Sequence, residues 1–166
     1  MRIGNKGDTI VEVLLATVVI SVVIAGAYAL TNRATRINQT ALERTNVSNA
    51  MREQIELVRG ARTAGADTDV WQAISARAIN SPPDYSTCAS PSSAFFIDPT
   101  LNDYYNSSFV QSYGGAINYN GLFRVWIEAF QPSSNSGYID FHVRSCWEGI
   151  GGEHEQNASL VMRIAE

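Results

Sequence analysis

The chain has 166 residues, a usual length for one domain, and its formal net charge of -4 provides no basic surface for nucleic acid. Hydrophobic residues make up 45% of it and aromatic residues 10%, which excludes a fully disordered chain. The sequence has one long apolar run, at residues 10–30, which argues against a membrane protein with several spans. Two cysteines are too few for a disulfide-dense scaffold or a four-cysteine zinc site.

The N-terminal segment is built like a membrane span. A helix over residues 10–30 would be about 30 Å long, the thickness of a bilayer core. Arg2 and Lys6 precede the apolar run and favour an N-terminus in the cytoplasm. Arg33 and Arg36, which follow the run, weaken this preference somewhat.

Glu12 decides between the alternatives for this segment. A signal peptide cut after Ala27 would explain the basic start, and a plain membrane anchor would explain the length of the apolar run. Neither explains Glu12, because a carboxylate inside an apolar span costs at least ~2.5 kcal/mol and is normally kept for a purpose.

Residues 6–12, Lys-Gly-Asp-Thr-Ile-Val-Glu, resemble the cleavage site of type IV prepilins and pseudopilins. In that family a short basic leader ends in a glycine, and a dedicated peptidase cuts after it and methylates the new N-terminus. The resemblance implies that residues 1–7 are the leader, Gly7 the cleavage glycine and Asp8 the new N-terminus. Glu12 matches the family's glutamate at the fifth mature position, whereas the family usually has phenylalanine where this chain has Asp8.

The resemblance also implies partners and a role for Glu12. In a pilus, the N-terminal amine of a neighbouring subunit would neutralise the Glu12 carboxylate in the dry fibre core and so set the axial register. The partners would be other pilin subunits, the prepilin peptidase and, before assembly, the cytoplasmic membrane. The alternative is a carboxylate that stays hydrated near the headgroups and has no role in assembly.

The apolar segment continues into an amphipathic one at residues 31–59, with no proline before Asn80. One apolar stripe is expected along this part, and Gly60 and Gly65 suit the end of the helix. Its members are Ile37, Ala41, Ala50 or Met51, Ile55 and Val58. A helix over residues 8–59 would be about 78 Å long, far beyond the usual length in a globular domain. The resemblance implies an α+β fold in which the second half of this helix covers an antiparallel sheet.

The head, residues 60–166, shows separate local signals. Residues 67–69, Asp-Thr-Asp, could cap a short helix that runs to Ile79, and a metal-binding role for these aspartates is the weaker alternative. Residues 95–97 predict a short strand. Asn120-Gly121 lies between two strand-like segments and is the strongest short-range signal for a β-hairpin.

Alternation of apolar and polar residues predicts three further strands, at about residues 123–130, 139–146 and 160–164. Their apolar positions would face the helix. The positions expected on the outward face are Arg124, Trp126, Glu128, Phe130, Asp140, His142, Arg144 and Cys146, with His142 in contact with solvent.

Cys88 and Cys146 are expected to form a disulfide, because the orientation argued above places the head outside the cytoplasm, where disulfides persist. The bond would attach the poorly patterned middle segment to the sheet. Two free buried thiols are the alternative.

The sequence contains no recognisable catalytic motif, metal site or cofactor site. His142 and His154 stand apart from any cysteine–histidine pair or HExxH pattern, and the glycines at 149–152 lack the strand-then-helix context of a phosphate loop. Loop tyrosines provide the remaining functional hint, because such surfaces suit adhesion or subunit contacts, although ordinary loop packing explains them equally well. These are Tyr85, Tyr104, Tyr105, Tyr113 and Tyr119.

These observations predict a non-enzymatic structural subunit of a type IV pilus or a related secretion filament. It would cross the cytoplasmic membrane once, with its head outside, and become part of a cell-surface filament. The alternative is a membrane-anchored or secreted binding domain that never polymerises. Any surface or DNA ligand is left open by the sequence, as is the choice between a major and a minor subunit.

Overall fold

The computed structural model describes residues 8–89, 91–112, 116–119, 121–133, 136–149 and 155–165, and for residues 8 and 9 the backbone alone. The chain forms two compact units, Met1–Leu42 and Glu43–Glu166. Helix α1, Asp8–Ala64, contributes residues to both. The fold is α+β, as the sequence predicts, with a long N-terminal helix packed on an antiparallel sheet.

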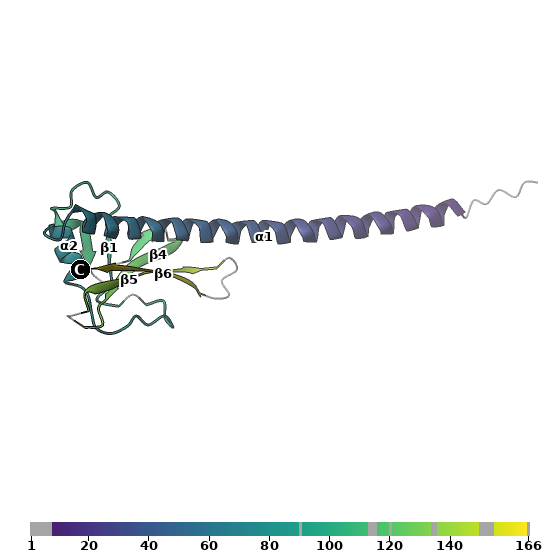
Figure 1. Ribbon diagram of the computed structural model, residues 1–166. Coiled ribbons are helices and arrows are strands. Elements are labelled where there is room, and N and C mark those ends of the chain that lie inside the picture. Colours follow the sequence, from purple (N-terminus) through teal and green to yellow (C-terminus); the bar gives the residue numbers. More distant parts are fainter. Residues whose placement is uncertain are drawn as a thin grey trace, which may run out of the picture. The chain divides into compact units, whose positions relative to one another are not determined.

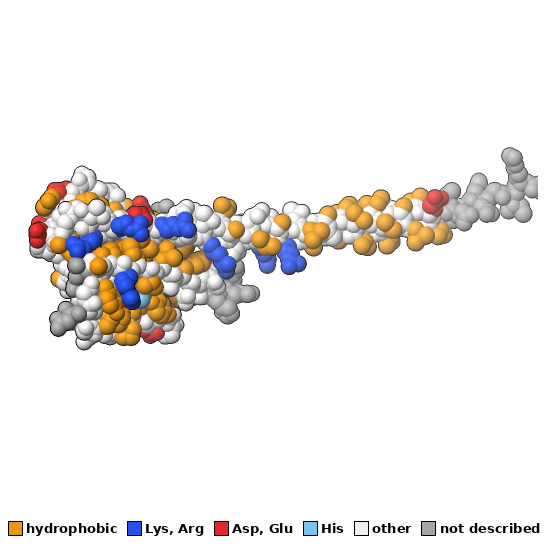
Figure 2. All heavy atoms as spheres, viewed as in Figure 1, with side chains coloured by type: hydrophobic (Ala, Val, Ile, Leu, Met, Phe, Trp, Pro, Cys, Tyr) orange, Lys and Arg blue, Asp and Glu red, His pale blue; other side chains and the backbone are white. Residues whose placement is uncertain are grey.

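The first unit exposes apolar side chains around the whole helix. Between Ile10 and Leu30 the large apolar side chains are more than half exposed (Figure 2). Because a helix satisfies its backbone hydrogen bonds internally, such a surface suits lipid better than water. Helix α1 is long and apolar enough to cross a membrane once.

The second unit contains a six-stranded antiparallel sheet, and the last part of α1 lies along one of its faces (Figure 1). The strand order is β2-β1-β4-β5-β6, and β3 also pairs with β4. Along the chain, a short α-helix, α2, follows α1, and a 3₁₀ helix, η1, lies between β1 and β2. The bounds are α2 Asp69–Ser75, β1 Phe95–Ile97, η1 Ser107–Phe109, β2 Val110–Ser112, β3 Ile117–Tyr119, β4 Phe123–Phe130, β5 Tyr138–Glu148 and β6 Glu155–Ala165.

The main core lies between α1 and the inner face of the sheet. The buried positions of α1 recur at steps of three or four, as expected for one helix face. They are Val47, Ala50, Met51, Gln54, Val58 and Ala61. The sheet contributes alternate residues of β4 and β5, and the inward residues of β6 pack against them. These are Phe123, Val125, Ile127, Ala129, Ile139, Phe141, Val143, Leu160, Met162 and Ile164.

The predicted helix stripe was therefore partly wrong. Ile37 is exposed and Ile55 is only partly buried, whereas Gln54, a polar residue, is fully buried in the stripe. Helix periodicity could not predict the burial of Gln54, because its side-chain amide is held by hydrogen bonds to the backbone of Ile97 on β1.

The end of α1 also differs from the predicted bounds. The helix continues through Gly60 to Ala64, and Gly65, with φ of 135°, follows it. Gly60 has a packing role instead, because a Cβ atom there would overlap the Tyr104 hydroxyl oxygen. Gly65 is the residue that takes the positive φ expected beyond a helix C-terminus.

The predicted short helix and the predicted β-hairpin of the head are both present, and the helix is shorter than predicted. Thr68 caps α2, since its side chain accepts a hydrogen bond from the Trp71 N–H, but the helix stops at Ser75 and not at Ile79. Ile79 instead forms a parallel bridge with Phe130. The predicted hairpin is present in the pairing of β3 with β4, where Tyr119 lies opposite Phe123; Asn120 itself is outside the described residues.

Much of the outward face of the sheet is covered, although Arg124 is exposed, and this corrects the expectation that His142 contacts solvent. Trp126, Glu128, His142 and Arg144 are all at least nine-tenths buried. Residues 80–89, hereafter the strap, have neither helix nor strand structure and contact this face. Alternation along β4 and β5 was predicted correctly, but it could not show that an irregular segment covers the polar side.

Candidate functional site

Two of the predicted processing and assembly residues, Asp8 and Glu12, lie at the start of α1. Gly7 and the leader are outside the described residues, and Asp8 is the first residue of the helix. Glu12 lies one turn further and is exposed. Among the residues that the structure describes, Glu12 has no hydrogen-bond or ion-pair partner, and the next charged residue along the chain is Arg33.

Other polar side chains of the apolar segment are satisfied within the helix. Thr17 Oγ1 donates to the Leu14 carbonyl at 2.8 Å, and Ser21 Oγ donates to the Thr17 carbonyl at 2.7 Å. Such back-bonding removes the cost of placing a hydroxyl in an apolar environment. Glu12 has no equivalent arrangement, so an apolar environment would require a cation from outside this helix.

The two cysteines of the head are joined. Cys88 of the strap and Cys146 of β5 form the disulfide that the sequence predicted, with a Cα–Cα distance of 5.8 Å. Cys146 lies beside Trp126 and Ala94 in a small second core on the outer face of the sheet. The bond therefore attaches the middle segment to the sheet, as expected.

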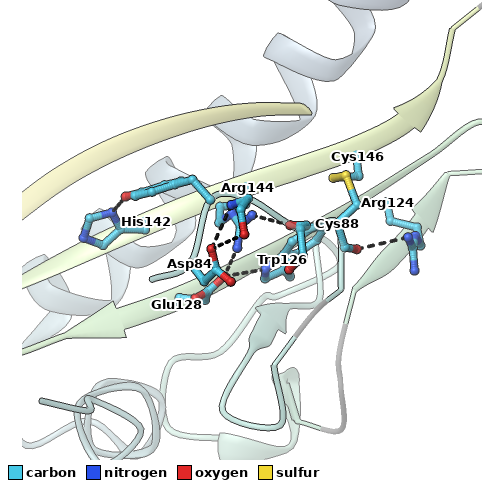
Figure 3. A network of polar contacts seen from close by, with 11 residues as sticks. Asp84, Cys88, Arg124, Trp126, Glu128, His142, Arg144 and Cys146 are labelled. Atoms are coloured by element: carbon cyan, nitrogen blue, oxygen red, sulfur yellow. Dashed lines mark hydrogen bonds and ion pairs between the residues drawn. A yellow bond between two sulfur atoms is a disulfide. The ribbon is translucent and has the colours of Figure 1, made fainter. Parts of the chain in front are cut away.

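A buried ion pair lies next to the disulfide (Figure 3). Arg144 Nη1 is 2.8 Å from Glu128 Oε1, and the same oxygen accepts a 2.8 Å hydrogen bond from Trp126 Nε1. Arg144 Nη2 donates to the Thr87 carbonyl at 2.7 Å. The guanidinium also contacts two aromatic rings, with Cζ 5.1 Å from the Trp126 centroid and 5.2 Å from the Tyr85 centroid. Burial of both charges is compensated by these contacts.

His142 lies along the same face. It is 9% exposed, its Nδ1 hydrogen-bonds the Tyr85 hydroxyl, and its buried Nε2 has no hydrogen-bond partner among the residues that the structure describes. Burial lowers the pKa of His142 below its ordinary value, against the opposing effect of Asp140 and Glu128. The sequence expectation of a solvated histidine was wrong, because Tyr85 covers it.

The loop tyrosines have different environments. Tyr104 packs over Gly60, and Tyr119 stacks on Phe123 with centroids 4.8 Å apart. The Tyr119 hydroxyl donates to Glu53, and burial together with that carboxylate raises the pKa of Tyr119 to about 12. Tyr105 is 68% exposed, and Tyr113 is outside the described residues. Most of the described loop tyrosines thus have packing roles.

The described residues offer no arrangement typical of a catalytic or metal centre. No three histidine, cysteine, aspartate or glutamate side chains of this part lie close enough to hold a metal ion. Grooves of about 470 and 310 Å³ border α1 where it packs on the head. Their described linings contain Glu53 and Tyr119 in the first groove, Arg44 in the second, and otherwise amides, serines and apolar side chains, but neither histidine nor cysteine. Asp67 and Asp69 flank the Thr68 cap.

Sequence reasoning missed the contacts between the strap and the sheet, although one signal was present. Trp126 lies opposite Arg144 and Glu128 opposite His142 in the β4–β5 register. A tryptophan and complementary charges on adjacent strands are an unusual set for a fully solvated face. Comparisons with protein-family models, curated proteins and solved structures found no match.

Proposed function

We propose that this chain is a structural subunit of a type IV pilus or a related secretion filament. The observation that carries the proposal is α1 itself, one helix from Asp8 to Ala64 whose two parts have different surroundings. Its first part exposes apolar residues and the carboxylate of Glu12, and its last part buries one face against the head sheet. A subunit that is held in a membrane and then polymerises through its helix needs both parts.

In this proposal, prepilin peptidase cuts between Gly7 and Asp8, and the mature subunit stays in the cytoplasmic membrane until it is assembled into a fibre. Transfer of the helix into a fibre keeps its apolar surface away from water. Glu12 then pairs with the N-terminal amine of a neighbouring subunit, since a buried carboxylate without a cation is penalised. The heads form the fibre surface and act through contacts, without catalysis. The basic leader and the disulfide support an orientation with the head outside the cytoplasm.

Glu12→Ala tests the assembly role. We expect the variant to remain in the membrane fraction but to fall about tenfold or more in the sheared-filament fraction. A hydrogen bond to a charged group contributes about 1.5–3 kcal/mol, and 1.4 kcal/mol corresponds to a factor of ten. The amount in each fraction is measured by quantitative immunoblotting.

Glu56→Ala is the matched control, because Glu56 lies on the same helix and makes an exposed ion pair with Arg59. This variant should enter filaments normally. Normal incorporation of Glu12→Ala would refute the role given to Glu12. Absence of the unaltered chain from any filament fraction would favour the non-polymerising binding domain.

A further inference from the structure

Arginines gather on the side of α1 that borders β6. Arg59 Nη2 lies 4.0 Å from Met162 Sδ of β6, and Arg62 Nε donates to the Ala165 carbonyl at 3.2 Å. Their spacing along the chain keeps the arginines on one side of a helix with about 3.6 residues per turn. Figure 2 shows basic side chains spaced along this part of α1, above hydrophobic ones. The members of this basic flank are Arg44, Arg52, Arg59 and Arg62.

Two members of the basic flank have charge available for an outside group. Arg44 and Arg52 are exposed, and neither has a hydrogen-bond or ion-pair partner among the described residues. Arg59 is 2.8 Å from Glu56, and more than half of each side chain is exposed. The chain has 16 acidic against 12 basic residues, so the basic flank is a local exception to its overall charge.

A groove of about 310 Å³ lies between the basic flank and β6. Val47, Met51 and Trp147 give it apolar walls, and Arg44 belongs to its lining. In the described sheet β6 is the last strand in the order and pairs with β5 alone, so the groove borders an edge of the sheet. An apolar groove beside cations suits an aromatic side chain that is accompanied by carboxylates.

Such a combination is present where α1 ends. The Val70 N–H donates to the Tyr104 carbonyl at 3.1 Å, which brings the loop around Tyr104 next to the start of α2. The aspartates of this region are exposed and make no ion pair within the part of the chain that the structure describes, and Tyr105 is 68% exposed. Figure 2 shows acidic side chains at this end of the head. The members of this acidic tip are Asp67, Asp69, Asp103 and Tyr105.

The groove and the acidic tip of one head are too far apart to bind each other. From Ser48 beside the groove to Ala64, where α1 ends, the helix is about 24 Å long. A second copy that points the same way, displaced by about this length along the helix axis, brings its acidic tip level with the groove. Copies that repeat such a head-to-tail contact continue into an open helical filament.

We propose that the acidic tip of one subunit binds the basic flank of a second copy of this chain, with Tyr105 in the groove and the aspartates beside Arg44 and Arg52. The contact rests on the filament role proposed above and names the head surfaces that meet in it. Opposite charges orient the two copies, and the tyrosine ring supplies buried contact area, as aromatic residues do at protein interfaces.

Charge reversal and its rescue test the contact, with the amount of chain in the sheared-filament fraction as the measurement. Arg44→Glu with Arg52→Glu should lower this amount about tenfold or more, because like charges across an interface are strongly penalised. Asp67→Arg with Asp69→Arg should do the same. The chain with all four substitutions has opposite charges again and should recover most of the unaltered amount. Loss in both pairs without this recovery would contradict the contact.

Asn46→Glu with Asn49→Glu is the control. These asparagines are exposed on the other side of α1, beside Tyr119, so the same two new glutamates should leave the filament fraction unchanged there. Circular dichroism of each purified variant shows whether it folds.

A photoreactive benzoylphenylalanine in place of Tyr105 tests the contact without any charge reversal. Irradiated filaments should contain cross-linked dimers of the chain, and mass spectrometry should place the cross-link on residues 44–51 or 156–160 of the second copy. Cross-links to other residues alone, or to another protein alone, would overturn the proposal.

The remaining outcomes separate this contact from the filament role. Normal filaments in both reversal pairs, while Glu12→Ala still blocks incorporation, would overturn the contact and leave the filament role standing. If the reversed flank in addition lost retention on a heparin column, the arginines would be assigned to a polyanionic ligand. Absence of the unaltered chain from filaments would overturn both proposals.

Discussion

Gln54 joins the helix to the sheet through both atoms of its side-chain amide. Its Nε2 donates to the Ile97 carbonyl and its Oε1 accepts from the Ile97 N–H, each at 2.9 Å. The glutamine is fully buried, and so is Ile97. These contacts fix where β1, a strand of only three residues, lies against α1.

Gln54→Leu should therefore be costly although leucine is a good helix former. Both backbone groups of Ile97 would lose their side-chain partner, at about 1–3 kcal/mol for each buried group. We expect the free energy of unfolding, measured by urea denaturation in detergent, to fall by about 2–6 kcal/mol. Gln72→Leu on the exposed side of α2 is the control and should change it by less than about 0.5 kcal/mol. Equal effects of the two substitutions would contradict the role of Gln54.

The residues of the outer sheet face show what single-residue patterns can predict. Alternation placed Glu128, His142 and Arg144 on one face correctly, yet their burial depends on the strap, which has no periodic pattern. Their partners are largely backbone carbonyls and rings from distant parts of the chain, such as Thr87 and Tyr85. Contacts between residues far apart in the sequence cannot be predicted from the local spacing of apolar and polar residues.

The elements themselves were largely predictable, because each has a local physical signal. Continuous apolar residues without proline predicted α1, and the turn residues between two alternating segments predicted the β3–β4 hairpin. The residue at which α1 ends was harder to predict from the sequence. In the sequence, Gly60 and Gly65 are equally good candidates for the residue that ends the helix. The packing of Tyr104 over Gly60 distinguishes them in the structure.

The strap is the element whose position depends most on a covalent bond. In the chain-entropy model, closing a loop of 58 residues between Cys88 and Cys146 stabilises the fold by about 4 kcal/mol. The double variant Cys88→Ser, Cys146→Ser should therefore unfold at a clearly lower temperature than the oxidised chain, as measured by circular dichroism.

Reductant provides the control for that prediction. It should lower the melting temperature of the unaltered chain towards that of the double variant and leave the double variant unchanged. Alkylation of both cysteines in unreduced, denatured protein would contradict the disulfide.

At the scale of the whole molecule, the two units have different surfaces and different cores. The first unit carries an exposed apolar surface with the Glu12 carboxylate in it, and the second carries a packed core reinforced by a disulfide. The sequence predicts a membrane part at residues 8–30, an amphipathic part at 31–59 and a head at 60–166, whereas the two compact units meet between Leu42 and Glu43. What the heads of assembled subunits would contact is set by surface shape and by partners, which a single chain does not encode as a local pattern.

The proposed filament role depends on one processing event before any other. Mass spectrometry of the protein from its native membrane gives the mature N-terminus directly. The account predicts that the chain begins at Asp8, after a cut that follows Gly7 and removes Arg2 and Lys6. A chain that begins after Ala27 would be a secreted protein, and one that retains its leader would be a plain membrane anchor. Either result would contradict the account.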